Sequence, residues 1–242
     1  ASQIQKAILP NRKKLTGLLP ESFILFKPKD LVSGDFYWFR QVKHKIILAV
    51  VDCTGHGVPG AFMSLISNEL LRDIIVSRKI TTPKEILKEL HNGIIQNLKK
   101  EENDSFNVDG MNIALCTLDL ENYCLDFASS GRPLVHLSED QVHVISGGRF
   151  PLGLITKKER VFEQKTISLR PGDQFYIFTD GFSDQFGGPN NEKLTRKGLI
   201  EQIYRNRKRP LNRQEEALTG YFNEWKGDNP QLDDVCMIGA RI

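Results

Sequence analysis

Four aspartates of this chain stand where a strand-length apolar or aromatic segment begins or ends, and this pattern restricts how the chain can fold. They are Asp35, Asp52, Asp180 and Asp233. A carboxylate at the end of a buried strand costs free energy unless a partner satisfies it. Several carboxylates in one place cost more, because like charges raise each other's pKa. A bound divalent cation would offset both costs, so the pattern favours a fold that gathers these strand ends around metal ions.

Strand patterns dominate the first and middle thirds of the chain, and paired helical patterns interrupt them. Strands are predicted at residues 22–28, 35–42, 45–51, 110–119, 123–129, 134–138, 142–145, 163–169, 174–179 and 234–242. Helices are predicted at residues 59–76, 83–98, 197–205 and 214–225. Short antiparallel strands with paired helices favour an α+β layered sandwich over a βαβ repeat. The apolar content of 40% is enough for one core to hold all of these elements.

The helix predicted at residues 59–76 starts at Pro59, a position that suits proline. Its apolar residues at helical spacing, which predict one buried face, are Phe62, Leu65, Ile66, Leu70, Ile74 and Ile75. Thr82 and Glu85 have the spacing of a capping box before the second helix, and Asn212 and Glu215 predict a cap for the last one.

Residues 1–10 have the pattern of an amphipathic helix that stops at Pro10. Ile4, Ala7 and Ile8 share one face of it, and no initiator Met precedes it. We interpret this segment as the end of a helical linker from an upstream sensor, and residues 11–242 as a single domain. An ordinary N-terminal helix is the alternative interpretation.

The charge pattern and the apolar runs exclude several classes of protein. The net charge is only +3, and the one basic run, residues 205–209, lies between two helical patterns as expected for a solvated loop, so we predict no nucleic-acid partner. No apolar stretch approaches the ~20 residues that span a bilayer, and no signal peptide is present. The four cysteines form no CxxC pair. We therefore expect a cytoplasmic domain without membrane contact, although the full-length protein could be anchored through upstream segments.

The residue types around the aspartates indicate which ions would bind. Carboxylates and backbone carbonyls suit Mg²⁺ or Mn²⁺, whereas zinc and copper prefer His and Cys. Of the five histidines only His56 lies in a glycine-framed loop. Two such ions would polarise a phosphoryl group and generate a hydroxide, so no nucleophilic side chain is needed. The chain accordingly has no P-loop, no GxSxG and no Cys-x5-Arg loop. Each aspartate taken alone is more often a turn residue than a ligand.

Together, these motifs are similar to those of a known family. The segments 32–36 (VSGDF), 52–57 (DCTGHG), 179–181 (TDG) and 233–234 (DD) resemble the metal-dependent type 2C (PPM) serine/threonine phosphatases. Segments 110–115, 131–134, 150–153 and 184–188 narrow the resemblance to the bacterial SpoIIE-like branch that includes the RsbU regulators. The resemblance covers the chain from about Leu9 to Ile242. It implies an α+β, four-layer α-β-β-α sandwich of two mostly antiparallel sheets flanked by helices.

The resemblance also implies roles for individual residues. Asp52 matches the aspartate that bridges two Mn²⁺ or Mg²⁺ ions, the Cys53 backbone carbonyl matches a ligand of the second ion, and Asp35 matches another carboxylate there. Asp180 and Asp233 match the aspartates that complete the cluster. Asp52 and Asp35 are thus the expected catalytic residues, in an attack of metal-bound water on phosphoserine or phosphothreonine. Further candidates in the same motifs are Asp234, Gly55, His56, Asn112 and Arg132.

Three positions depart from the family pattern without removing a ligand. Cys53 stands where glycine is frequent, Asn112 where aspartate is common, and Cys236 where Ser or Thr is usual. Arg132 is a candidate for binding the substrate phosphate, but the pattern around it favours a structural arginine in a turn.

The resemblance implies a phosphorylated regulatory protein of the anti-sigma-antagonist type as substrate, an upstream sensor domain and a possible homodimer. Helices 59–76 and 83–98 could act as a switch on the site or could simply form an outer layer. One rival interpretation is a catalytically weak or inactive phosphatase-like interaction module, which the intact aspartate set disfavours. Another is a different two-metal hydrolase, such as a phosphodiesterase or nuclease. The lack of histidine ligands and of a basic, aromatic-lined groove disfavours it.

Overall fold

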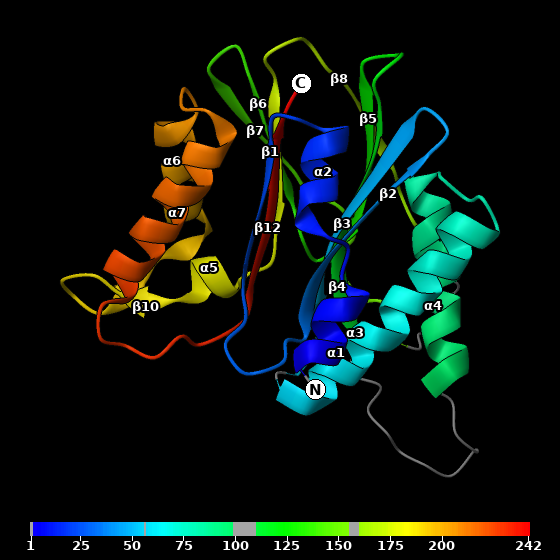
Figure 1. Ribbon diagram of the computed structural model, residues 1–242, viewed down its shortest axis with the longest axis horizontal. Coiled ribbons are helices and arrows are strands. Elements are labelled where there is room, and N and C mark those ends of the chain that lie inside the picture. Colours follow the sequence, from blue (N-terminus) through cyan, green and yellow to red (C-terminus); the bar gives the residue numbers. More distant parts are fainter. Residues whose placement is uncertain (1, 56, 99–109, 155–159) are drawn as a thin grey trace.

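A computed structural model describes residues 2–55, 57–98, 110–154 and 160–242. Two five-stranded antiparallel sheets lie face to face, and helices cover their outer faces (Figure 1). One cluster of buried apolar residues draws on both sheets, a second on the first sheet and its helices, and a third on the other sheet and its helices. These three apolar layers separate four layers of secondary structure. The prediction of an α+β, four-layer α-β-β-α sandwich is confirmed.

Each sheet is built from strands that lie close to the predicted ranges. The first sheet has the order β2 (Asp35–Val42), β3 (Lys45–Cys53), β4 (Met111–Asp119), β5 (Cys124–Ser130) and β8 (Lys165–Ser168). The second has the order β1 (Ser22–Lys27), β12 (Val235–Arg241), β9 (Gln174–Phe178), β6 (Leu134–Ser138) and β7 (Gln141–Ile145). The last strand of the chain thus pairs with the first and with β9, which joins distant parts of the sequence in one sheet.

The helices form two outer layers and a short N-terminal pair. The first sheet is covered by α3 (Gly57–Arg72), its π-helical continuation η1 (Asp73–Ser77) and α4 (Pro83–Leu98). The second is covered by α5 (Gly181–Asp184), α6 (Thr195–Asn206) and α7 (Leu211–Lys226), with a small hairpin of β10 (Phe186–Gly187) and β11 (Glu192–Lys193) beside them. The N-terminal pair is α1 (Ser2–Ile8) and α2 (Arg12–Leu18), and Leu15 of α2 packs into the core between the sheets.

Several details differ from the sequence-based predictions. Helices α2 and α5 and the β10–β11 hairpin were not predicted, because each is too short to show a period. The last helix begins after Pro210 with no side-chain cap, so Asn212 lies inside it and the predicted cap is wrong. Helix α4 does begin at the predicted place, where the Glu85 and Ile86 amides donate to the Thr82 carbonyl.

The predicted buried face of α3 is wrong in its first turns. Phe62 is 63% exposed, and the buried positions carry small or polar residues such as Gly60, Ala61 and Ser64. The reason is a close approach of backbones, because a Cβ on Gly60 would overlap the carbonyl oxygen of Gly55 and the Cα of Gly34. The helix therefore packs through its glycine against the loop that follows β3.

Replacing Gly60 by alanine tests this close approach. The added methyl group would force the Gly55 carbonyl or the helix to move, so we expect Gly60→Ala to destabilise the domain by ~1–3 kcal/mol. Gly220→Ala in α7 is the matched control, because nothing lies within 4 Å of its Cβ position. That change should stabilise the helix by ~0.5–1 kcal/mol. Urea unfolding of both variants measures the two effects, and equal effects of the same sign would contradict this packing.

Candidate functional site

One row of side chains crosses the end of the first sheet. The antiparallel register pairs Asp35 of β2 with Asp52 of β3, and Asp52 with Asn112 of β4. Residues paired across antiparallel strands present their side chains to the same face of the sheet. The register therefore places two carboxylates and one amide side by side.

The second sheet supplies the other acidic residues. Asp180 directly follows Thr179 at the end of β9, and Asp233 and Asp234 precede the neighbouring strand β12. The Cys236 amide donates to the Thr179 hydroxyl at 3.0 Å, which ties these two strand ends together. Gly181 allows the next approach, because a Cβ there would overlap the Asp234 carbonyl oxygen.

Asp35 is a deeply buried carboxylate, at 4% exposed. Its Oδ2 atom has no hydrogen-bond partner among the described residues. Burial raises the pKa of the Asp35 carboxyl well above its usual range, and the nearby Asp52 raises it further, while a hydrogen bond with Thr179 acts in the opposite direction. An ionised Asp35 thus lacks sufficient compensation from the protein itself.

Asp52 lies where carboxylates from both sheets meet. Burial raises its pKa to about 6, and Asp180 and Asp233 also raise it. The guanidinium of Arg132 opposes this rise but does not cancel it. Asp52 of the first sheet and Asp180 of the second therefore lie close enough to repel each other.

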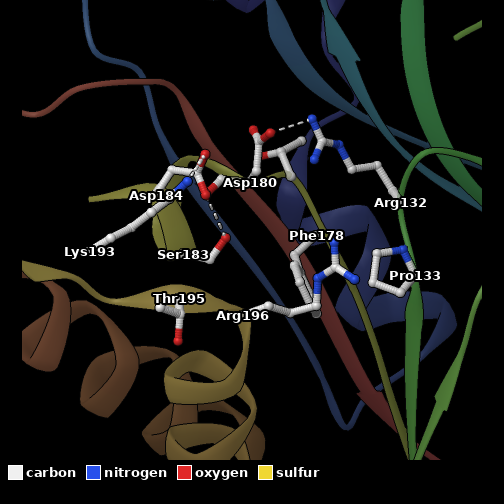
Figure 2. A pocket seen from close by; sticks show the side chains of 10 residues that line it. Arg132, Pro133, Phe178, Asp180, Ser183, Asp184, Lys193, Thr195 and Arg196 are labelled. Carbon is white, nitrogen blue, oxygen red and sulfur yellow. Dashed lines mark hydrogen bonds and ion pairs between the residues drawn. The ribbon is translucent and has the colours of Figure 1, made fainter. Parts of the chain in front are cut away.

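Arg132 lies between these two aspartates. Its Nη2 atom contacts Asp52, with which it forms an ion pair, and lies 2.6 Å from Asp180 (Figure 2). Burial lowers the pKa of the guanidinium, but Asp52 and Asp180 outweigh burial and raise it overall. The sequence pattern favoured a structural arginine in a turn, whereas the structure brings Arg132 into the acidic cluster.

Asn112 supports the turn that carries Arg132. Gly131 has a φ of 74°, and a Cβ at this position would overlap the Asn112 side chain. Ile113 also bridges to Gly131. Asn112 is therefore adjacent both to Asp52 and to the arginine turn, which agrees with a structural contact at this position.

Asp234 has a different environment from its neighbour Asp233. Both oxygens of Asp234 accept backbone hydrogen bonds, one from the Lys29 amide at 2.7 Å and one from the Gly34 amide at 2.8 Å. Asp234 is 2% exposed and holds the loop that precedes Asp35. Asp233 is more exposed, and partial burial raises its pKa. The local structure thus gives Asp234 a bracing role, while the charge of Asp233 lies close enough to raise the pKa of Asp35 and of Asp52.

The loop after β3 lies close to the backbone of two other segments, at Gly110 and at Gly34. The Thr54 hydroxyl donates to the Gly110 carbonyl at 2.6 Å, and Gly55 adopts a φ of 89° that favours glycine. A Cβ on Gly34 would lie 3.0 Å from the Cys53 carbonyl oxygen, so this carbonyl faces the strand that begins with Asp35. His56 lies outside the described residues.

The donor set of the cluster fits a hard divalent cation. It consists of carboxylate oxygens and one backbone carbonyl, including a buried Asp35 oxygen without a partner. One guanidinium, that of Arg132, faces several carboxylates, which leaves an excess of negative charge. In the part of the chain that the structure describes, no three His, Cys, Asp or Glu side chains stand close enough to hold a metal ion as they are.

A pocket of about 370 Å³ opens beside the cluster (Figure 2). Its lining runs from the acidic cluster to the start of α6 and comprises Arg132, Pro133, Phe178, Thr179, Asp180, Ser183, Asp184, Lys193, Thr195 and Arg196. Lys193 and Arg196 were not predicted as site residues, because they lie outside every motif. The hairpin and α6, which no motif marks as functional, bring them to the pocket.

Comparison with known families assigns the chain. The family model described as Stage II sporulation protein E (SpoIIE) matches residues 43–242. The chain belongs to the SpoIIE family. The resemblance inferred from the motifs is therefore confirmed. A comparison with curated protein sequences found no match.

Solved structures with the same fold include PP2C phosphatase domains. The SiaA-PP2C domain of Pseudomonas aeruginosa superposes with a TM-score of 0.89 at 31% identity, covering 100% of this chain and 94% of that one. The PP2C phosphatase domain of SpoIIE from Bacillus subtilis, solved with a fragment of its regulatory domain, gives 0.72 at 20% identity, covering 92% of this chain and 63% of that one. RsbX in complex with magnesium gives 0.63 at 15% identity, covering 91% and 94%.

These comparisons place the SpoIIE-family domain among the PP2C-type phosphatases, and this homology supports phosphatase activity. Among the described residues, no helix has both the length and the apolar character needed to cross a bilayer.

The charge excess in the cluster predicts how pH affects the metal-free domain. The folded-state pKa of Asp35 is raised, so its ionisation favours unfolding, and stability is lost as pH rises from about 4. Replacing Asp35 by asparagine removes this penalty. We expect Asp35→Asn to gain ~1–2 kcal/mol in chelator at pH 7.5, a rise of ~2–8 °C in Tm.

The gain should shrink as the pH falls toward about 4 and vanish below it, where the carboxyl is protonated in both the folded and unfolded states. Thermal unfolding at several pH values measures it, with the exposed Asp228→Asn as a control that should show no such trend. A loss of stability in Asp35→Asn at pH 7.5 would contradict an uncompensated charge at this position.

Proposed function

We propose that this domain is a metal-dependent serine/threonine protein phosphatase. The observation that carries the proposal is the convergence of carboxylates from both sheets, Asp35 and Asp52 from one and Asp180 and Asp233 from the other. Homology to PP2C-type phosphatases supports the same reaction. The substrate we propose is phosphoserine or phosphothreonine on a regulatory protein of the anti-sigma-antagonist type.

The groups that would hold the metal are the carboxylates gathered at the cluster and one backbone carbonyl. We assign the ligands to Asp35, Asp52, the Cys53 backbone carbonyl, Asp180 and Asp233. Two Mn²⁺ or Mg²⁺ ions bound there would activate water and neutralise the phosphoryl oxygens. Asp234 is left out of the ligand set, because both of its oxygens already accept backbone hydrogen bonds.

Arg132 has a second task in this proposal. Its guanidinium is the basic group in contact with Asp52 and Asp180, so it lies where the phosphate of a substrate must approach the cluster. A planar guanidinium can bind two phosphate oxygens at once. We therefore assign Arg132 to binding the phosphoryl group when Asp52 and Asp180 bind the metal ions instead of the guanidinium. A purely structural arginine remains the alternative.

Turnover measurements test the proposed reaction. With Mn²⁺, we expect the domain to hydrolyse p-nitrophenyl phosphate and a phosphoserine peptide, and chelator should abolish both activities. Asp52→Asn and Asp180→Asn should each lower kcat/KM by ~100-fold or more, because each loses several kcal/mol of charge stabilisation. The exposed Asp228→Asn should keep full activity.

Three outcomes would contradict this proposal. Activity that survives chelator or either substitution would exclude the metal mechanism. Hydrolysis of phosphodiesters without monoesters would favour a nuclease or phosphodiesterase. Binding of a phosphoprotein without any turnover would favour the inactive interaction module.

We further propose that residues 1–10 end a linker from an upstream sensor and couple it to the site. Gln5 of α1 makes the contact between this segment and the domain. Gln5 is buried, at 7% exposed. Its amide donates to the Ser33 carbonyl at 2.6 Å and to the Ser64 hydroxyl of α3 at 3.1 Å, and its carbonyl accepts from the Ser33 amide at 3.0 Å. Ser33 lies two residues before Asp35.

Gln5 thus joins the linker, the segment that precedes Asp35, and α3. Since α3 begins just after the Asp52 loop, α3 and α4 could transmit a shift of the linker to the ligands. The alternative is that both helices are only an outer layer. A homodimer formed through the linker is part of the same proposal, and sedimentation of the full domain with and without residues 1–9 tests it.

Replacing Gln5 tests the coupling. Gln5→Ala leaves the Ser33 backbone groups without partners, which costs ~1–3 kcal/mol. We expect it to lower both Tm and the Mn²⁺-dependent kcat. Gln3→Ala is the control, because Gln3 is exposed on the same helix. Unchanged kcat and unchanged apparent Mn²⁺ affinity in Gln5→Ala would contradict a link to the site.

A further inference from the structure

The pocket beside the acidic cluster has one basic side chain that is not committed to an ion pair. Arg132 is paired with Asp52 and Asp180, and Lys193 is paired with Asp184 at 2.8 Å. Arg196 makes no ion pair within the described residues and is exposed. It is therefore the cation at this pocket that is available to a ligand.

The position of Arg196 directs it toward the pocket. It lies in the first turn of α6, and Figure 2 shows its side chain reaching toward Phe178 and Pro133 rather than away from the cavity. Thr195, the preceding residue, has a φ of 70°, which is unusual for a β-branched side chain. This turn of the chain presents Arg196 over the apolar floor made by Phe178 and Pro133.

The chemistry of the lining suits a carboxylate on a short aliphatic stem. The planar guanidinium of arginine matches a carboxylate through two parallel hydrogen bonds. The apolar floor would contact the methylene groups of an Asp or Glu side chain. The two acidic residues of the lining, Asp180 and Asp184, already have basic partners, so they add little repulsion.

The pocket extends from the proposed reaction site to Arg196, so a carboxylate bound there could belong to the same substrate. The pocket is continuous from Arg132 and Asp180 to Arg196. When the phosphoryl group of a substrate lies at the acidic cluster, the peptide that carries it would extend along the pocket. An extended peptide advances ~3.3 Å per residue, so a side chain ~1–3 residues away would reach Arg196.

We propose that this pocket binds an acidic residue that flanks the phosphorylated residue of the protein substrate, and that Arg196 recognises its carboxylate. This inference rests on the proposed phosphatase function and adds a substrate class to it. The same arginine could instead bind the phosphate itself, and the experiment distinguishes the two sources of negative charge.

Binding is measured first, without turnover. Fluorescent peptides carry a non-hydrolysable phosphonate analogue of phosphoserine, with Glu or Gln placed in turn at each of the three positions on either side. In Mn²⁺ and low salt, we expect the wild-type domain to prefer Glu over Gln by about fivefold at one or two positions, near the upper limit for an exposed ion pair. The preference should fall with added salt.

Arg196→Ala should remove the preference, and Arg196→Glu should reverse it in favour of a Lys-containing peptide. Lys197→Ala is the matched control, because this exposed neighbour in α6 does not line the pocket. It should keep the preference within about twofold. Equal binding of Glu and Gln peptides by the wild type, or an equal loss in Lys197→Ala, would overturn the proposal.

Turnover measurements distinguish binding of the flanking carboxylate from binding of the phosphate. Arg196→Ala should leave kcat/KM for p-nitrophenyl phosphate unchanged and lower it only for the peptide with the flanking acid. A similar loss on all phosphate substrates would show that Arg196 binds the phosphate and would overturn the proposal. If the wild type hydrolyses nothing, the proposed phosphatase function fails, and the peptide-binding preference still decides the role of Arg196.

Discussion

Repulsion between carboxylates at one end of the two sheets is the constraint on which the rest of this structure depends. Asp35 and Asp52 lie side by side in one sheet, and Asp180 and Asp233 approach them from the other. Burial and mutual repulsion raise the pKa of Asp35 and of Asp52. Isolated charges of this kind would push the sheets apart. The protein opposes this with one guanidinium, that of Arg132, and with apolar cores on both sides of each sheet.

The backbone near the cluster is arranged to hold these charges at close range. Gly34, Gly60 and Gly181 lie where a side chain would overlap a neighbouring backbone, so loops and helix ends approach more closely there than other residues allow. The side chains of Asp234 and Gln5 then fix the segment before Asp35 through hydrogen bonds to its backbone. The same devices that place the carboxylates also connect them to α1 and α3. A change in these contacts would therefore affect the position of the carboxylates.

Much of the fold was predictable, because the apolar periods of the long strands and helices are strong. The register of β2 with β3 agrees with the predicted strands and places Asp35 opposite Asp52. Prediction failed where local signals are weak or misleading. Phe62 was assigned to a buried face, yet α3 packs through Gly60, because backbone contact excluded a large side chain. Arg132 was considered a turn residue, since no spacing in the sequence relates it to Asp52 and Asp180.

The sequence by itself determined the family, the layered α+β fold and the acidic residues expected at the site, because these depend on motifs and on apolar periodicity within short segments. Only the tertiary structure decided which charges meet. It placed Arg132 between two aspartates, gave Asp234 a bracing role beside Asp233, and brought Arg196 to the pocket. The reason is that contacts between the sheets, and between a helix and a distant loop, depend on the packing of the whole chain.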